Sequence, residues 1–295
     1  MEAVRGGGEG RGGGGGDEGE KKTPRLALLE ARQAVEEHGR AGEKRQQDRV
    51  SRAMSKVLRH TAKQVGVDMT PEGYVEVEKL VRVLPKGADV SAVKSVVDAD
   101  QKHRFGWKVD GDGKAWVRAN QGHSHELVER DALLHRITHT EDLPKRCVHG
   151  TTRDAWEKIK AAKGLARMGR NEIHLATGDF SDGSAVVSGM RKSSQVHVYV
   201  DAVLCLERGV PLYLSENGVV LCPGLGPRGV LPTGYFARVV DARTGSELEF
   251  ERTFDLVDGE SAGQDDDEAA RGEGAAAPHG SPPKGDSADS SAPVF

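Results

Sequence analysis

The sequence predicts an α+β protein whose folded centre lies between two disordered tails. Helical hydrophobic spacing fills much of the first half of the chain, whereas short β-rich segments dominate the second half. The ends carry too few apolar side chains to form a core. Residues 6–16 read GGGEGRGGGGG, and the chain from Ser246 onward is acidic and rich in small residues and proline. We therefore expect disordered tails at 1–22 and 246–295.

The net charge of the chain hides a basic centre. Its 295 residues carry a formal charge of −4. Ser246–Phe295 holds 13 acidic and 3 basic residues, a net of −10, which leaves +6 for residues 1–245. A basic centre favours a polyanionic partner such as nucleic acid or a nucleotide, although ordinary solvated surface charge would explain the same number.

Cysteine usage and hydropathy indicate the compartment. Cys147, Cys205 and Cys222 are few, odd in number and far apart, so neither a disulfide framework nor a structural zinc site is expected. No apolar run is long enough to cross a membrane, and no secretory signal begins the chain. We expect a soluble, intracellular monomer without a membrane partner, and cytoplasm and nucleus fit equally well.

Residues 46–142 are predicted to form the first lobe, which begins with a two-faced helix. An apolar and a cationic stripe both recur at steps of three or four residues. The apolar stripe comprises Val50, Ala53, Met54, Val57, Leu58 and Val65, and the cationic stripe comprises Arg49, Arg52, Lys56, Arg59 and Lys63, with His60 at its edge. Residues 23–45 carry a further apolar patch and are expected to form an accessory helix.

Two more helices and a hairpin complete this lobe. Asp89 or Ser91 is the expected N-cap of the last helix, and Gly111-Asp112-Gly113 is a suitable hairpin turn. The two helices and the two strands are predicted at Val75–Val83, Asp89–Ala99, Arg104–Asp110 and Lys114–Asn120. Three helices followed by a hairpin is the element order of a winged-helix domain, so a winged-helix-like, nucleic-acid-binding lobe is expected.

Residues 143–245 are predicted to form a second, mixed lobe. A helix at Thr152–Lys163 stops at Gly164, and a shorter one is expected at Ser184–Arg191. Strands are predicted at Arg146–His149, Glu172–Ala176, Gln195–Val200, Pro211–Ser215 and Gly218–Cys222. Neither GxGxxG nor GxxxxGK[ST] occurs, so a nucleotide would bind here by another scheme.

Short motifs carry a resemblance to a known family. The order and spacing of these segments resemble the RNA 2′-phosphotransferases, and the seven-residue RANQGHS string is the most specific of them. The segments are Ser55–His60 (SKVLRH), Arg118–Ser124 (RANQGHS), His149–Thr151 (HGT), Ser188–Arg191 (SGMR), and Asn217–Leu221 (NGVVL) with Pro223-Gly224. The resemblance covers about Val50 to Val240.

The resemblance implies both a fold and a reaction. It implies that the second lobe is ADP-ribosyltransferase-like and that NAD is a co-substrate. The RNA 2′-phosphate would attack the nicotinamide-bearing ribose carbon, and a ribose hydroxyl would then attack phosphorus. The products would be 2′-hydroxyl RNA, nicotinamide and ADP-ribose 1″,2″-cyclic phosphate. The RNA partner would carry an internal 2′-phosphate, as ligated tRNA does.

By the same resemblance, the catalytic tetrad is Arg59, His60, Arg118 and Arg191. These residue types suit the chemistry. A phosphate monoester is already an anion, so it needs orientation and charge stabilisation more than a base. Arginine offers a planar fork that holds two phosphate oxygens. Histidine can donate a hydrogen bond to the phosphate or carry a proton at the sugar hydroxyl.

Further residues are assigned by resemblance to the NAD and phosphate pockets. The NAD-binding set is His149, Gly150, Thr151, His174, Ser188, Gly189, Asn217 and Gly218. The residues of the phosphate or NAD pocket are Lys56, Asn120, Gln121 and His123. Glu172 departs from the pattern, because the family often has a histidine there. No metal is expected, since the motif segments hold no carboxylate cluster.

Two other functions fit the same residues. The tetrad could serve an ADP-ribosyltransferase that acts on terminal phosphates of RNA or DNA. The first lobe could also belong to a non-catalytic module that only binds nucleic acid. Taken singly, Arg59 and His60 could be a solvated helix face, Arg118 an outward strand residue, and Arg191 a cation favoured at a helix C-terminus.

Overall fold

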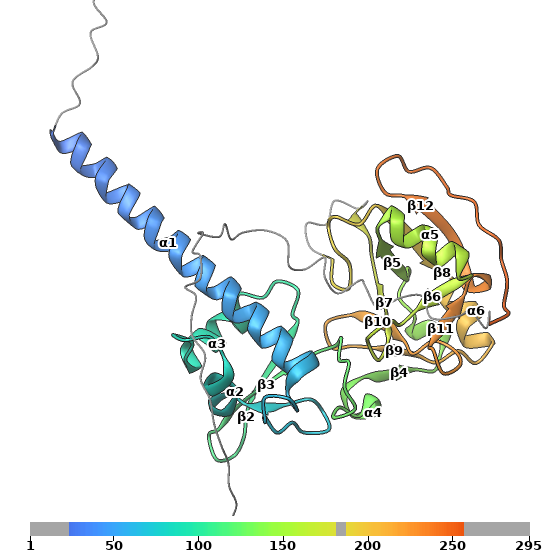
Figure 1. The fold of residues 1–295 in the computed structure, drawn as a ribbon, viewed down its shortest axis with the longest axis horizontal. Coiled ribbons are helices and arrows are strands. Elements are labelled where there is room, and N and C mark those ends of the chain that lie inside the picture. Colours follow the sequence, from blue (N-terminus) through green and yellow to red (C-terminus); the bar gives the residue numbers. More distant parts are fainter. Residues whose placement is uncertain (1–23, 181–186, 257–295) are drawn as a thin grey trace, which may run out of the picture. The chain divides into compact units, whose positions relative to one another are not determined.

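The computed structural model describes residues 24–180 and 187–256 and shows a mixed α and β protein (Figure 1). The N-terminal tail predicted at 1–22 lies outside the described residues. The helices are α1 (Pro24–Lys56), the π-helical turn η1 (Val57–Thr61), α2 (Val77–Val83), α3 (Val90–Asp98), α4 (Arg130–Leu133), η2 (Thr140–Asp142), α5 (Arg153–Ala161), α6 (Ala202–Glu207) and η4 (Thr233–Tyr235). The strands are β1 (Val75–Glu76), β2 (Phe105–Val109), β3 (Ala115–Ala119), β4 (His135–Ile137), β5 (Val148–Thr151), β6 (Gly164–Ala166), β7 (Ile173–Ala176), β8 (Val196–Val200), β9 (Leu212–Leu214), β10 (Val219–Cys222), β11 (Val230–Pro232) and β12 (Phe236–Asp241).

The predicted helices and hairpin of the first half are present. The Asp89 side chain caps α3 by accepting a hydrogen bond from the Ala92 N–H, and β2 pairs with β3. A short strand that the sequence pattern did not reveal, β1, pairs with β3 to make a three-stranded sheet in the order β1-β3-β2. The two predicted helix segments at 23–45 and from 46 onward form one continuous helix, α1.

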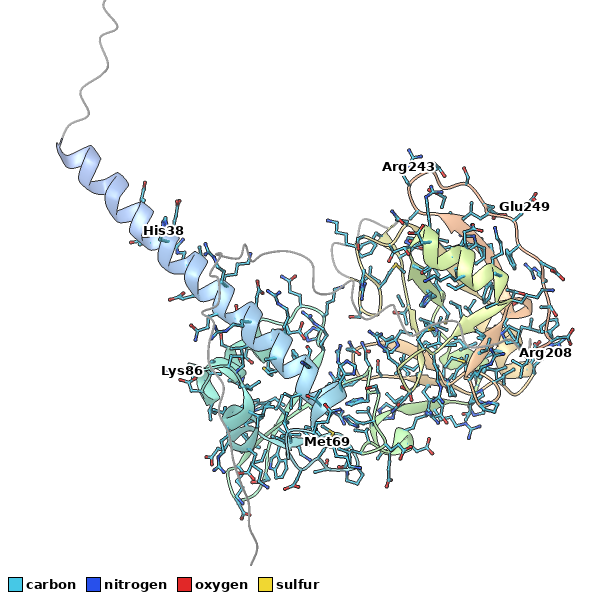
Figure 2. All side chains as sticks on the ribbon, viewed as in Figure 1. His38, Met69, Lys86, Arg208, Arg243 and Glu249 are labelled. Carbon is cyan, nitrogen blue, oxygen red and sulfur yellow. The ribbon has the colours of Figure 1, made fainter. Side chains whose placement is uncertain are left out.

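One hydrophobic core joins α1, η1, α2, α3 and this small sheet. Met54 and Leu58 are completely buried in it, together with Val75 and Val117 of the paired strands. The α1 side chains from Glu36 to Gln46 are all exposed, as seen around His38 (Figure 2). The C-terminal part of α1 is therefore the part that anchors the helix and delivers η1 to the core.

The second half contains a seven-stranded sheet with the order β12-β8-β5-β7-β10-β9-β4. All of its strand pairs are antiparallel, and His174 of β7 faces Leu221 of β10. β4 and β12, which were not predicted, form the two edges. Because β4 pairs with β9, the predicted lobe boundary at 142/143 lies after a strand that already belongs to this sheet.

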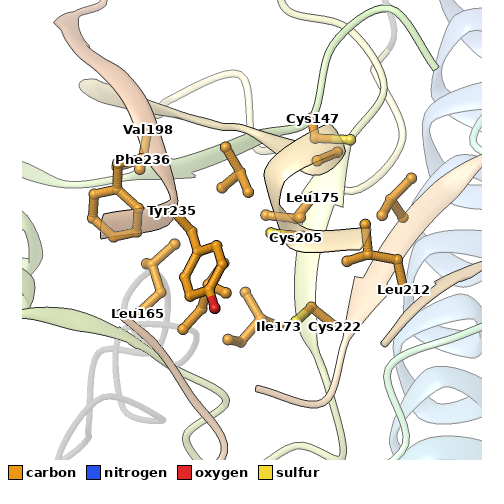
Figure 3. Close-up of a cluster of buried hydrophobic side chains, with 14 of the residues drawn as sticks. Cys147, Leu165, Ile173, Leu175, Val198, Cys205, Leu212, Cys222, Tyr235 and Phe236 are labelled. Carbon is orange, nitrogen blue, oxygen red and sulfur yellow. The ribbon is translucent and has the colours of Figure 1, made fainter. Parts of the chain in front are cut away.

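One face of the large sheet packs against a core that also receives α5 and α6. Trp156 of α5 is buried there. Figure 3 shows Cys205 of α6 in the same core, close to Leu175 of β7. Cys147 and Cys222 belong to the same core, and all three cysteines are free thiols. Burial raises the pKa of Cys147 to about 12 and that of Cys222 to about 11, so these thiols are protonated core side chains.

The predicted start of the acidic tail at Ser246 is too early. Residues 246–256 are described and pack along the second core, with Leu248 and Phe250 against it. The Leu248 N–H donates to the Val239 carbonyl, and the Thr253 carbonyl accepts from the Gly234 N–H. The prediction relied on the acidic composition of this segment and overlooked the apolar residues that alternate with its charged residues. Residues 257–295 lie outside the described part of the chain.

We expect Phe250→Ala to lower the free energy of unfolding by about 2 kcal/mol, less than the roughly 3–5 kcal/mol of a fully buried phenylalanine. Phe250 is half-buried, and its ring lies 6.1 Å from that of Trp156 and 5.7 Å from that of Phe236. Urea unfolding measures the change, with Glu249→Ala at an exposed neighbour as the control. Equal stability of both variants would mean that this segment does not contribute to the core.

Candidate active site

The first two residues of the predicted tetrad, Arg59 and His60, lie on a π-helical turn. η1 continues α1 and buries Val57 and Leu58, which leaves Arg59 half-buried and His60 exposed. π-helical turns inside α-helices are uncommon and occur frequently at functional sites. Lys56, predicted for the phosphate pocket, is exposed at the last residue of α1. The sequence pattern predicted the helix but not this local widening.

The RANQGHS segment, together with the next residue His125, runs along this turn and is bound to it by three hydrogen bonds. The Ser124 N–H donates to the Arg59 carbonyl at 3.0 Å, and His60 Nδ1 lies 2.9 Å from Ser124 Oγ. His125 Nε2 lies 3.3 Å from the Leu58 carbonyl oxygen. Two motifs that are far apart in sequence therefore form one local structure.

Gly122 leaves space between Arg59 and His174. Its φ of +88° is a conformation that favours glycine. A Cβ atom there would lie 3.4 Å from His174 Nε2 and 3.6 Å from Arg59 Nε. The glycine of RANQGHS thus keeps open the gap between a residue of η1 and a residue of β7.

Arg118, on β3, is held by a carboxylate and an aromatic ring. Its guanidinium carbon lies 4.7 Å from the centre of the Tyr74 ring, and its Nη2 forms an ion pair with Glu216. The Arg118 side chain is only 12% exposed, whereas that of Glu216 is 58% exposed. Glu216 precedes the predicted NAD-pocket residue Asn217, so this ion pair joins two of the motifs.

Several buried polar atoms of the predicted site have no hydrogen-bond partner among the described residues. Such atoms are rare in folded proteins because each loses its hydration without compensation. They are Arg59 Nε and Nη2, Arg118 Nε, Asn120 Oδ1, His123 Nε2, His125 Nδ1 and His174 Nε2. All but the His125 atom belong to residues that the motifs had assigned to the site. Unsatisfied guanidinium donors in such a cluster are what an anionic ligand would satisfy.

The cluster is also crowded with positive charge. Burial lowers the pKa of Arg59 to about 10, and the nearby charges of Arg170 and Arg104 add to the effect. Asp100 acts in the opposite direction. Arg170 and Arg104 lie outside the assigned motif residues, and no periodicity pointed to them. A bound phosphate would relieve the repulsion among these cations.

His149 and His174 are neutral at physiological pH. Burial lowers the pKa of His174 well below its ordinary value and also lowers that of His149. His174 Nδ1 lies 3.0 Å from the Glu172 carbonyl oxygen, and His149 Nδ1 lies 3.1 Å from the His174 carbonyl oxygen. A carbonyl only accepts, so both Nδ1 atoms carry the proton and both Nε2 atoms are acceptors. These rings are thus prepared to accept hydrogen bonds from hydroxyl groups.

His123 makes stability depend on pH. Burial, with smaller effects of His125 and Arg59, lowers its pKa to about 3 in the folded state, below an unfolded value of about 6.5. Below pH 6.5 the unfolded chain takes up a proton that the folded chain does not. The free energy of unfolding therefore decreases as the pH is lowered from 7 to 5. We expect His123→Gln to remove about 2 kcal/mol of the stability difference between pH 7 and pH 5.

Urea unfolding at both pH values tests this expectation. His38→Gln, at an exposed position of α1, is the control and should leave the difference as in the unchanged protein. The same pH dependence in the His123 and His38 variants would show that His123 is not responsible.

The remaining predicted NAD-pocket residues have specific packing or hydrogen-bonding positions. A Cβ on Gly150 would lie 2.5 Å from Met190 Cγ, so the 188–191 segment packs directly on β5, whose last residue is Thr151. Gly189 and Gly218 both have positive φ, +80° and +72°. Ser188 Oγ and Asn217 Nδ2 both donate to the Lys102 carbonyl, at 3.1 and 3.0 Å. A direct NAD contact by these side chains stays a prediction.

Arg191 follows this packed segment and is exposed. The helix predicted at Ser184–Arg191 is not formed by its described part, because Val187–Arg191 makes a turn instead. The positive φ of Gly189 and its close packing against Val219 are incompatible with a continuous helix. Residues 184–186 lie outside the described residues.

A polar cavity of about 310 Å³ adjoins the cluster through Gln121 and His123. Glu172, the departure from the family pattern, is buried in its wall and accepts a hydrogen bond from Arg130 Nε at 3.0 Å. Burial raises the pKa of Glu172, and Arg130 opposes that shift. Arg130, Arg167 and Asn171 also line the cavity, and the sequence reasoning missed all three.

The described residues offer neither a metal site nor a membrane-spanning helix. Over residues 24–180 and 187–256, no group of three or more His, Cys, Asp or Glu side chains is arranged to hold a metal ion. In the same described part of the chain, no helix has the length and apolar character needed to cross a membrane.

Comparisons with known proteins agree with the geometry. Residues 45–224 match the family described as RNA 2′-phosphotransferase, Tpt1 / KptA family. The chain is similar to tRNA 2′-phosphotransferase 1 of Danio rerio, with 38% identity over 203 residues that cover 68% of this chain and 88% of the relative. It is also similar to tRNA 2′-phosphotransferase 1 of Homo sapiens, with 37% identity over 210 residues that cover 69% of this chain and 81% of the relative. A Schizosaccharomyces pombe protein named for the same activity is 41% identical over 191 residues, 64% of this chain and 50% of that longer protein.

Proposed function

The chain belongs to the RNA 2′-phosphotransferase family, and we propose that it removes an internal 2′-phosphate from RNA by transferring that group to NAD. Ligated tRNA is the proposed RNA, because the similar proteins are named for tRNA. The proposed products are 2′-hydroxyl RNA, nicotinamide and ADP-ribose 1″,2″-cyclic phosphate.

The observation that carries the proposal is the set of buried donors on Arg59 and Arg118 that have no partner in the described part of the chain. A phosphate monoester brings up to three oxygens and a negative charge, which would satisfy these donors and the crowded cations at once. Arginine forks hold such a group in a fixed orientation. His60, exposed next to Ser124, is proposed to carry a proton at the sugar hydroxyl in the second step.

The residues of the cluster also fit the ribose parts of NAD. The Nε2 atoms of His149 and His174 are acceptors, and the gap at Gly122 brings one of them close to Arg59. When bound, NAD supplies an electrophilic ribose carbon with nicotinamide as its leaving group. We propose that the two histidines accept hydrogen bonds from ribose hydroxyls and so orient that carbon towards the phosphate on Arg59.

The fold is proposed to divide this work between two lobes. The α1–α3 helices with the β2–β3 hairpin are proposed to form a winged-helix-like lobe that binds RNA. The seven-stranded sheet is proposed to form an ADP-ribosyltransferase-like lobe that binds NAD, with its pocket formed by the 149–151, 188–189 and 217–218 segments. Support comes from the element order and from the hydrogen bonds that join the SGMR and NGVVL motifs of the second region to Lys102 of the first.

The test is a single-turnover assay on a short RNA with one internal 2′-phosphate, with and without NAD. Formation of 2′-hydroxyl RNA and nicotinamide only with NAD is the expected result. No loss of the 2′-phosphate in either condition would refute the proposal. A stable ADP-ribose cap on a terminally phosphorylated strand, without 2′-phosphate removal, would show the alternative transferase activity instead.

A further inference from the structure

We propose that Lys102 is a positioning residue that fixes the segment carrying Arg191 relative to Arg59 and Arg118. The inference rests on the proposed function, in which Arg191 acts on the substrate phosphate. Lys102 lies in the turn between α3 and β2, outside every motif of the sequence. Its side chain and its carbonyl both contact the second half of the chain.

The Asp100 side chain makes the turn around Lys102 rigid. One of its oxygens accepts from the Lys102 N–H at 3.3 Å and from Arg104 Nε at 3.0 Å, and the other accepts from the Arg104 N–H at 2.5 Å. The Asp100 carboxylate is 2% exposed, so solvent competes little for these bonds. A turn with this many internal hydrogen bonds presents Lys102 in one conformation.

Lys102 holds the Arg191 segment by hydrogen bonds from its side chain and to its carbonyl, which we call the Lys102 clamp. Its Nζ donates to the Met190 carbonyl at 2.9 Å, one residue before Arg191. Its own carbonyl accepts from Ser188 Oγ at 3.1 Å and from Asn217 Nδ2 at 3.0 Å. The SGMR and NGVVL motifs therefore meet at a single residue of the first half of the chain.

The same turn is connected to the arginines of the first half. The His103 carbonyl accepts from Asn120 Nδ2 at 2.8 Å, and the Asn120 N–H donates to the Arg104 carbonyl at 2.9 Å. On the other side, Glu216 next to Asn217 forms the ion pair with Arg118. Lys102 thus stands where the RANQGHS segment, the Arg118 ion pair and the Arg191 segment are joined.

Loss of the Nζ donor should free the Arg191 segment while the rest of the fold remains. We expect Lys102→Met to accelerate hydrogen–deuterium exchange of peptides covering residues 187–195 by about 10-fold, as for one lost charge-assisted hydrogen bond. This measurement needs neither RNA nor NAD. Lys94→Met is the matched control, because it removes one lysine charge from an ion pair with Asp98 within α3. Exchange in Lys102→Met equal to that of the control would overturn the proposal.

Kinetics then separate a positioning role from a purely structural one. In single-turnover reactions, Lys102→Met is expected to release nicotinamide at a rate close to wild type but to form 2′-hydroxyl RNA about 10-fold more slowly, so ADP-ribosylated RNA accumulates. Lys102→Arg, which keeps a cationic donor, is expected to restore most of the second step. Equal slowing of both steps in Lys102→Met when Arg191→Ala slows only the second step, or no rescue by arginine, would contradict the proposal.

The two proposals can fail independently. A wild-type protein that releases no nicotinamide would refute the proposed function, while the exchange measurement still tests the clamp. An active wild type with an unchanged Lys102→Met variant would refute the clamp alone. Thermal unfolding of each variant shows that any effect is measured on folded protein.

Discussion

Arg59→Lys is expected to slow NAD-dependent formation of 2′-hydroxyl RNA by about 10²- to 10³-fold, the cost of removing an oriented donor from a transition state. Arg59 has two buried nitrogens, Nε and Nη2, and Nε lies at the gap that Gly122 keeps open. A lysine would retain the charge but would present one compact ammonium group in place of the fork. The decrease in rate for Arg59→Lys therefore reports how much the guanidinium contributes by orienting the phosphate, because the positive charge is retained.

Arg52→Lys is the matched control for this prediction. Arg52 lies on the cationic stripe of the same helix, two turns before Arg59, but it is exposed and donates to the Asp48 carbonyl of its own helix. We expect its activity to stay within about twofold of wild type, as for an exposed charge. A loss below tenfold for Arg59→Lys, or equal losses in both variants, would show that the fork of Arg59 does not hold the phosphate.

Folded stability provides a second measure for the same variant. Arg59 lies near the positive charges of Arg170 and Arg104, and two of its nitrogens lack hydrogen-bond partners within residues 24–180 and 187–256. Such a site is optimised for its ligand at the expense of the free protein. Urea unfolding of Arg59→Lys should therefore give a stability equal to or above that of wild type, which separates loss of function from loss of fold.

Elements with strong local signals were the ones that the sequence predicted well. The β2–β3 hairpin combines strand alternation with a glycine turn, and α3 has a capping aspartate, so neither needs distant contacts to be recognised. β1 is two residues long and merges with α2, and β4 and β12 are edge strands defined by partners that lie far away in the sequence. Their identity depends on tertiary pairing, which local pattern does not contain.

The same distinction applies to the site. The resemblance named Arg59, His123 and His174, and the structure places the side chains of Arg59 and His174 next to Gly122 of RANQGHS, which also contains His123. Lys102 and Arg170 have no motif of their own, and their positions follow only from the turn at Asp100 and from the packing around Arg59. For Ser188 and Asn217 the resemblance named the residues but not their contacts. Both were assigned to the NAD pocket, and both side chains donate hydrogen bonds to the Lys102 carbonyl.

Arg191→Ala is expected to separate the two chemical steps. Arg191 is exposed and follows the carbonyl held by Lys102, so its removal should leave the packed segment in place. We expect nicotinamide release at a rate within about tenfold of wild type, because the proposed phosphate-binding residues Arg59 and Arg118 remain. Formation of 2′-hydroxyl RNA should slow by at least about 10²-fold, since charge at phosphorus then lacks one stabilising fork.

The measurement follows nicotinamide and RNA species together in a single turnover, and the expected signature is accumulation of ADP-ribosylated RNA. Lys192→Ala, at the next exposed position, is the control and should leave both rates near wild type. If Arg191→Ala slows nicotinamide release as much as formation of 2′-hydroxyl RNA, Arg191 already acts in the first step. The Lys102→Met variant should then follow the same pattern, because the clamp can act on chemistry only through the residue that it positions.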